Sequence, residues 1–209
     1  RTSRRSGGIG MSRVPRRGSG AAMCLVMLLA GLLGTGPAAT QTRLLLPADL
    51  ALTDHTGAPF TPRNTRGKVV LLAFGYTHCP DVCPMTLSVM AQTMRTLGTD
   101  ADRVAPLFVS LDPARDVPLL LAQYVRYFHP AIVGLTGTER ELKRLTSSLS
   151  TDFDVRGDLA GDRYTLDHTA NLYLIDASGQ VASIVPFGLP PAFLADRVLA
   201  LINGEDVDE

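Results

Sequence analysis

Residues 69–87 have the sequence VVLLAFGYTHCPDVCPMTL, in which an apolar run is followed by a short loop and a helical pattern. The continuous aliphatic and β-branched run is typical of a strand that is buried on both faces. Cys79 and Cys83 follow it, four positions apart, at the predicted start of a helix. Unpaired N–H groups and partial positive charge at a helix N-terminus favour a thiolate over a thiol. The stretch therefore predicts a strand–loop–helix unit that presents two reactive cysteines.

Outside this unit, strands and helices alternate along the chain. Residues 52–60 contain a turn signal between apolar flanks and predict an N-terminal hairpin. The later patterns predict, in order, a strand (104–113), a helix (116–130), a strand (131–135), a helix (136–149), a polar stretch (156–168), two strands joined by a turn (169–188) and a helix (189–204). This alternation implies a sheet covered on both faces. A terminal antiparallel hairpin added to such a sheet indicates a thioredoxin-like α/β fold, with a central mixed sheet flanked by helices.

The charge of the chain is unevenly distributed. The chain of 209 residues has 20 basic and 20 acidic residues, but residues 1–40 carry six arginines and no acidic residue. The remainder thus has 14 basic and 20 acidic residues and a net charge of −6. Nucleic-acid-binding proteins normally show the opposite sign, so we do not expect a nucleic acid partner.

The N-terminal segment has the pattern of an export signal. Its arginines are followed by an apolar run, which includes Cys24, and then by small residues. Cleavage of this segment and its retention as a membrane anchor are both compatible with the pattern. The expected organisation is an export signal or membrane anchor (1–40), a linker (41–48), a thioredoxin-like domain (49–205) and a tail (206–209).

The cysteine pair has several possible roles on residue chemistry alone. The two sulfurs can close a disulfide, exchange disulfides with a partner, or bind a soft metal ion such as Cu(I). A structural zinc site usually has four ligands, and an iron–sulfur cluster needs more cysteines than this pair provides. Met90 and Met94 lie at helical spacing, which indicates core packing rather than copper ligation.

A copper site would need a further ligand, most naturally a histidine. His55 is predicted to be solvated in a turn, His78 to be a loop residue, and His129 to complement the C-terminus of a helix. His168 differs, because it is predicted to lie in a loop just before a strong strand, beside Asp167, which could orient its ring or raise its basicity.

Four segments together resemble the SCO/SenC family of thioredoxin-fold copper-binding proteins, which assist assembly of the binuclear copper centre of cytochrome c oxidase. They are FGYTHCPDVCPMTL (74–87), VSLDPARD (109–116), YVRYFHPAIVGLTGT (124–138) and DHTANLYLIDASGQV (167–181), in family order. The resemblance implies that Cys79, Cys83 and His168 bind copper, as Cu(I), Cu(II) or both. Asp112 and Pro113 match a family segment that we interpret as structural. Met85 departs from the family, in which this position is often acidic, so partner recognition can differ.

The expected function is therefore that of a copper metallochaperone. Its expected partners are the copper-bearing subunit of cytochrome c oxidase or another copper protein, and a protein that keeps the thiols reduced. The alternative is a thiol–disulfide oxidoreductase that uses the same cysteines, so whether the protein is an enzyme stays open. A peroxidase is disfavoured because no arginine accompanies Thr77 in the cysteine loop. We expect the protein to be exported, either periplasmic or anchored to the outer face of the inner membrane.

Overall fold

The computed structural model describes residues 44–157 and 163–207. The predicted export segment, with Cys24, lies outside these described residues. Within them, no helix has both the length and the apolar character needed to span a membrane.

The centre of the fold is a seven-stranded mixed sheet in the order β2-β1-β5-β4-β3-β8-β9. Strands β3, β4 and β5 run parallel, whereas β1 is antiparallel to β2 and β5, β8 to β3, and β9 to β8. The strands are β1 (Leu52–Asp54), β2 (Pro59–Phe60), β3 (Val69–Gly75), β4 (Val104–Ser110), β5 (Val133–Thr136), β8 (Leu172–Ile175) and β9 (Val181–Val185). The predicted mixed sheet and N-terminal hairpin are confirmed.

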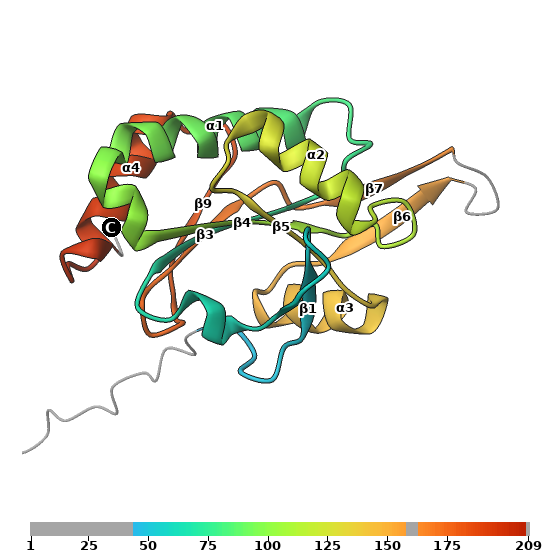
Figure 1. Ribbon diagram of the computed structural model, residues 1–209, viewed down its shortest axis with the longest axis horizontal. Helices are drawn as coiled ribbons and strands as arrows, with labels where there is room; N and C mark the ends of the chain where they lie inside the picture. The colour runs from blue at the N-terminus through green and yellow to red at the C-terminus, as the bar shows by residue number, and fades with distance from the viewer. Residues whose placement is uncertain (1–43, 158–162, 208–209) are drawn as a thin grey trace, which may run out of the picture. The chain divides into compact units, whose positions relative to one another are not determined.

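Helices cover both faces of this sheet. Figure 1 shows α1, α2 and α4 on one face and α3 on the other. The helices are α1 (Val82–Leu97), α2 (Pro118–Phe128), α3 (Glu139–Ser148) and α4 (Pro191–Ile202), with short 3-10 helices η1 (Pro62–Thr65) and η2 (Gly98–Arg103). The prediction of a thioredoxin-like arrangement, a sheet flanked by helices, is confirmed.

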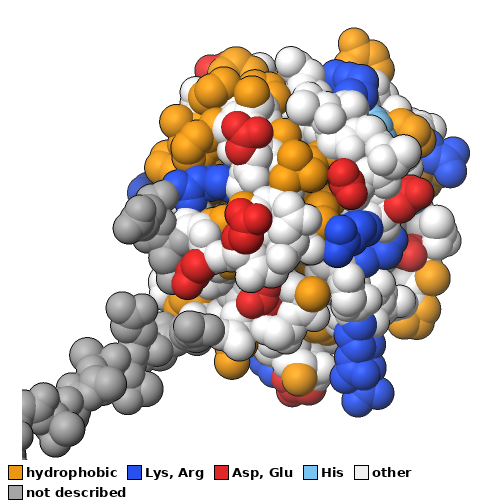
Figure 2. All heavy atoms as spheres, turned by 90° about the vertical axis from the view of Figure 1, so that its left-hand side faces the viewer, with side chains coloured by type: hydrophobic (Ala, Val, Ile, Leu, Met, Phe, Trp, Pro, Cys, Tyr) orange, Lys and Arg blue, Asp and Glu red, His pale blue; other side chains and the backbone are white. Residues whose placement is uncertain are grey.

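The core follows the apolar patterns of the sequence. Every residue of β3 is buried, as expected for a strand covered on both faces. Met90 and Met94 on α1 are 0% and 2% exposed, which confirms that they pack in the core. On the face drawn in Figure 2, acidic and basic side chains are interspersed with apolar ones and do not form a broad basic surface.

A second, two-stranded sheet was not predicted. Strands β6 (Phe153–Gly157) and β7 (Tyr164–His168) pair antiparallel with each other. We expected a polar connection here because only one face of β7 is apolar. Leu166 is buried, whereas its neighbours Thr165 and Asp167 are exposed, which is the alternation of a half-buried strand.

The parallel pairing of β3 with β4 places two loops side by side: the cysteine loop (76–81) after β3 and the acidic loop (111–117) after β4. Gly75 lies opposite Ser110 in the register, and the Leu111 N–H donates a 2.8 Å hydrogen bond to the Gly75 carbonyl. Because parallel strands end at the same edge of a sheet, the cysteine loop after β3 lies beside the acidic loop after β4.

Candidate metal centre

The cysteine loop connects the end of β3 to the first turn of α1. A tight turn begins it, with the Cys79 N–H donating to the Tyr76 carbonyl at 3.3 Å. The helix begins at Val82, so Cys83 lies in its first turn and Cys79 in the loop before it. Pro84 is tolerated there because first-turn N–H groups lack helical partners. Both cysteines are free thiols.

Cys83 is the more buried of the two cysteines, at 1% exposure, and Cys79 is partly buried against the same core. Burial raises the pKa of the Cys83 thiol well above its ordinary value, and a hydrogen bond with the Cys79 thiol and the charge of Asp116 raise it further. The expectation that the helix N-terminus favours a thiolate is therefore wrong for Cys83. Burial of the sulfur is the largest of these effects and outweighs the hydrogen bond from the Tyr76 backbone, which acts to lower the pKa.

His168 lies directly against this buried thiol. Its Nε2 is 3.7 Å from Cys83 Sγ, although the two residues are 85 positions apart in the chain. Its Nδ1 lies 2.9 Å from the Thr169 carbonyl oxygen, which can only accept, so the proton resides on Nδ1 and the Nε2 lone pair faces the sulfur. Burial lowers the pKa of His168 and so favours the neutral ring.

Two expectations about His168 are wrong. It is the last residue of β7 rather than part of a loop. The Asp167 carboxylate does not orient the ring but accepts a 2.9 Å hydrogen bond from Arg156 Nε. The reason is that successive side chains of a strand point to opposite faces. The ring is instead fixed by Thr169 and by edge-on contact with Tyr76, whose ring centroid is 6.3 Å away. Burial has the largest effect on the pKa of His168 and lowers it, but the charge of Asp167 acts to raise it, as the alternative expectation held.

Of the other histidines, His55 and His129 contact different parts of the fold, whereas His78 lies in the cysteine loop. Nδ1 of His78 is 3.1 Å from the Thr77 hydroxyl and 3.8 Å from the Asp116 carboxylate. His78 is a half-exposed loop residue, as predicted. His55 is not simply solvated, because its Nδ1 accepts a 3.0 Å hydrogen bond from the Gly134 N–H on β5. His129 does not act as a cation at the helix end. Burial and the charge of Arg95 lower its pKa, and Nδ1 accepts from the Ala131 N–H at 3.2 Å.

Asp116 fixes the start of the cysteine loop. This carboxylate is fully buried and accepts hydrogen bonds from the Thr77 hydroxyl (2.6 Å), the Thr77 N–H (2.8 Å) and the Ser110 hydroxyl (2.6 Å). Three donors compensate the cost of burying the charge. Thr77 is thereby held two residues before Cys79.

A second acidic group of the same loop reaches the β6–β7 hairpin. Asp112, 3% exposed, accepts hydrogen bonds from Arg115 Nε (2.5 Å) and from the Tyr164 hydroxyl (2.7 Å). Our sequence interpretation gave this segment only a structural role and assigned none to Asp116, Arg115 or Tyr164. The signal that could have found Arg115 and Asp116 is the charged sequence DPARD (112–116) directly after a buried strand, because residues there lie at the edge of a parallel sheet where ligands bind. It gives no indication of Tyr164.

The donors around Cys83 suit a soft metal ion. Two ligands of one ion, each about 2.0–2.3 Å from it, lie roughly 3.5–4 Å apart, and the 3.7 Å between Cys83 Sγ and His168 Nε2 falls in this range. Across residues 44–157 and 163–207, no three His, Cys, Asp or Glu side chains form a ready-made site. Binding through both cysteines and the histidine therefore requires a movement of side chains.

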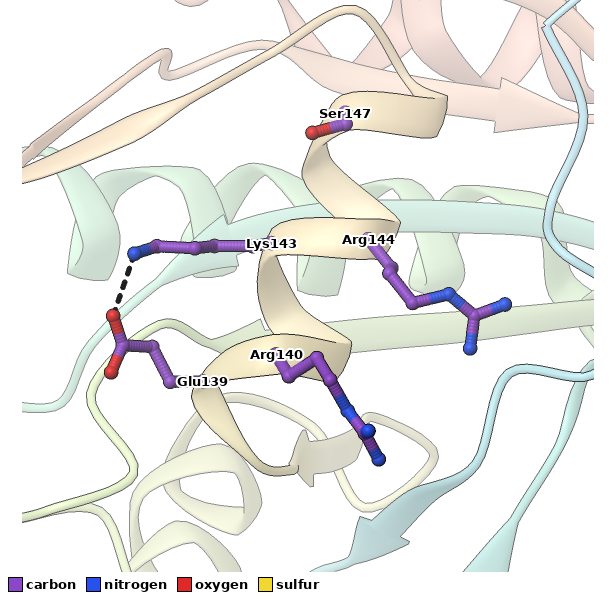
Figure 3. A pocket seen from close by; sticks show the side chains of 5 residues that line it. All are labelled: Glu139, Arg140, Lys143, Arg144 and Ser147. Carbon is purple, nitrogen blue, oxygen red and sulfur yellow. Dashed lines mark hydrogen bonds and ion pairs between the residues drawn. The ribbon is translucent and has the colours of Figure 1, made fainter.

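A hollow over α3 is a different kind of surface. Figure 3 shows its basic side chains, with Lys143 directed to Glu139 and Arg144 on the opposite side. Lys143 pairs with Glu139 and Arg144 with Asp49, each at 2.7 Å. None of the predicted site residues lines the hollow, so it is not part of the candidate centre.

Comparison with known proteins gives concordant matches. The SCO1/SenC family model matches residues 38–203. An SCO2-like protein of Rickettsia felis is 38% identical over 141 residues, covering 67% of this chain and 69% of the relative. Bradyrhizobium japonicum ScoI with copper bound has a TM-score of 0.68 and 36% identity, covering 73% of this chain and 96% of that one. Yeast Sco1 with copper bound has a TM-score of 0.69 and 32% identity, covering 76% and 89%.

Proposed function

Because the chain belongs to the SCO1/SenC family, we propose that it is a copper metallochaperone. It binds one copper ion through the thiols of Cys79 and Cys83 and Nε2 of His168. It delivers this ion to the copper centre of cytochrome c oxidase, the role that the family resemblance implies.

One observation carries the proposal: His168 Nε2 lies 3.7 Å from Cys83 Sγ with its proton on the opposite nitrogen. An unprotonated ring nitrogen is the form that binds a metal. Thiolates and imidazole are ligands that select copper over hard cations such as Mg²⁺. The copper-bound ScoI and yeast Sco1 structures, both above 30% identical, support the choice of metal.

The burial of Cys83 has a consequence for loading. Its raised pKa keeps the metal-free thiol protonated, so copper binding must release that proton. Three ligands leave one side of the ion open to an incoming ligand of the receiving protein. Cys79, which is more exposed than Cys83, is the ligand that such an exchange reaches first.

Thiol–disulfide exchange is the second candidate function, because the Cys79 and Cys83 thiols contact each other. Such a reductase needs both sulfurs but no histidine against the buried one. The position of His168 therefore favours copper delivery. An oxidised pair cannot bind copper, so we also propose a reducing protein partner. We further propose, from the sequence of residues 1–40, that the protein is exported and either periplasmic or membrane-anchored.

Metal analysis of the full chain tests this function. The reduced protein is loaded with Cu(I) or Cu(II), and its bound copper and absorption spectrum are measured. Cys79→Ser and Cys83→Ser should each abolish stoichiometric binding, since a hydroxyl is a hard, weak ligand. His168→Ala should weaken retention of copper but leave disulfide exchange intact.

His78→Ala is the matched control, because His78 adjoins Cys79 and is half-exposed. It should retain copper like the parent. If His168→Ala held copper as tightly as His78→Ala, His168 would not be a ligand. If the parent bound no copper but its thiols reduced a protein disulfide, the reductase function would replace the proposed one.

A further inference from the structure

The strand that carries His168 is not part of the main sheet. In the part of the chain that the structure describes, β7 pairs with β6 in a separate two-stranded sheet, while both cysteines belong to the unit built on β3 and α1. His168 itself therefore makes no pairing in the seven-stranded sheet, which the chain joins again at Leu172, the first residue of β8. Contacts between the hairpin and the main body therefore help to set the position of His168 relative to Cys83.

Tyr164, the first residue of β7, makes two polar contacts with the main body. Its hydroxyl donates a 2.7 Å hydrogen bond to Asp112 Oδ1, in the loop after β4. Its backbone carbonyl accepts a 3.2 Å hydrogen bond from Arg115 Nη1, and the Arg115 guanidinium carbon lies 3.6 Å from the centre of its ring. Asp112 and Arg115 also pair with each other, so three residues form one connected group.

This group and His168 lie on the same face of β7. Tyr164, Leu166 and His168 are at least partly buried, whereas Thr165 and Asp167 are exposed. At about 3.3 Å per residue, Tyr164 lies roughly 13 Å along the strand from His168, so it acts through the strand and not on the metal.

A further contact with the main body is made at Leu166, which lies between Tyr164 and His168 on β7. The backbone of Leu166 forms a hydrogen bond with the Tyr76 hydroxyl, and the Tyr76 ring meets the His168 ring edge-on. The Arg115 guanidinium carbon is 5.7 Å from the centre of the Tyr76 ring. Arg115 thus contacts both β7 and the residue that begins the cysteine loop.

We propose that Tyr164, anchored by Asp112 and Arg115, is a positioning residue that holds His168 against Cys83 for copper binding. This inference rests on the proposed function, because positioning matters for copper only if His168 is a ligand. The anchoring carboxylate is almost fully buried, so its hydrogen bond to the Tyr164 hydroxyl is shielded from competition by water.

The test is Tyr164→Phe, which removes the hydroxyl and keeps the ring against Arg115. Copper affinity should fall by roughly tenfold, the lower end of what loss of an outer-shell partner typically costs. In the metal-free variant, amide hydrogen exchange of residues 164–168 should be faster than in the parent, whereas α1 should exchange as before. Tyr127→Phe is the control, because Tyr127 is 85% exposed, and it should change neither measurement.

A double-mutant cycle separates positioning from general destabilisation. Combined with His168→Ala, Tyr164→Phe should cause no further loss of copper affinity, because its effect passes through the imidazole. An equal loss in both backgrounds, or parental affinity and exchange in Tyr164→Phe, would overturn the inference and leave copper binding intact. A parent chain that binds no copper would instead overturn the proposed function and, with it, the role of Tyr164.

Discussion

Gly75→Ala should damage the candidate centre from the strand beneath it. A Cβ at Gly75 would lie 2.7 Å from Phe108 Cε2 and 2.8 Å from Cys83 Sγ. Favourable contacts between carbon atoms are about 3.5–4.0 Å, so one neighbour must move by roughly 1 Å. Phe108 is fully buried in the sheet core, so part of the displacement falls on Cys83 in the first turn of α1.

Overpacking of this kind costs about 1–3 kcal/mol of the free energy of unfolding. For a domain of this size, each 1 kcal/mol lowers Tm by about 2–4 °C. We therefore expect Gly75→Ala to lower Tm by roughly 2–12 °C, to speed alkylation of Cys83, and to weaken copper binding. Thermal unfolding of the metal-free protein, the rate of thiol alkylation and copper affinity are the three measurements.

Gly137→Ala is the matched control for this prediction. Its Cβ would lie 2.7 Å from Leu52 Cδ2, the flexible end of a side chain on β1, far along the chain from both cysteines. It should lower Tm by a similar or smaller amount while leaving alkylation and copper affinity unchanged. Parental Tm and parental copper affinity in Gly75→Ala would refute the reasoning, as would an equal loss of copper affinity in Gly137→Ala.

Three further changes test the fold. Leu87→Ala on α1, at a fully buried position, should cost about 2–5 kcal/mol through the cavity it leaves, measured by denaturant unfolding; a loss below that range would mean that the core collapses around it. Thr138→Ala removes the hydroxyl that accepts from the Glu141 N–H and donates to its carboxylate; we expect a loss of about 0.5–2 kcal/mol, which Thr96→Ala should not reproduce. The pKa of His129 is lowered in the fold, so the stability it contributes is present above its unfolded value of about 6.5 and is lost as pH falls. His129→Asn should therefore lose less stability than the parent between about pH 7 and about pH 5 in urea titrations, and equal losses would contradict the lowered pKa.

Local sequence patterns predicted much of the architecture. The apolar run of β3 and the periodic spacing of α1 each depend on neighbours within a few residues. Such signals can be read from the sequence because buried residues recur with the period of the helix or strand. In the hairpin β6–β7 this signal is short, since each strand has five residues and only alternate ones are at least partly buried.

In the candidate site, too, local features could be predicted from the sequence and contacts between distant segments could not. The sequence alone determined that Cys79 and Cys83 lie at a strand–helix junction and that His168 precedes β8, because each follows from local spacing. Only the tertiary structure decided that His168 lies against Cys83 and that the Asp167 side chain points away from it. It also decided that Asp116 holds the cysteine loop, and that Asp112 and Arg115 contact Tyr164 on β7. The burial of Cys83, which raises the pKa of its thiol, was likewise decided by the tertiary structure. The physical reason is that these properties depend on desolvation and on contacts between segments up to 85 residues apart, which no local pattern encodes.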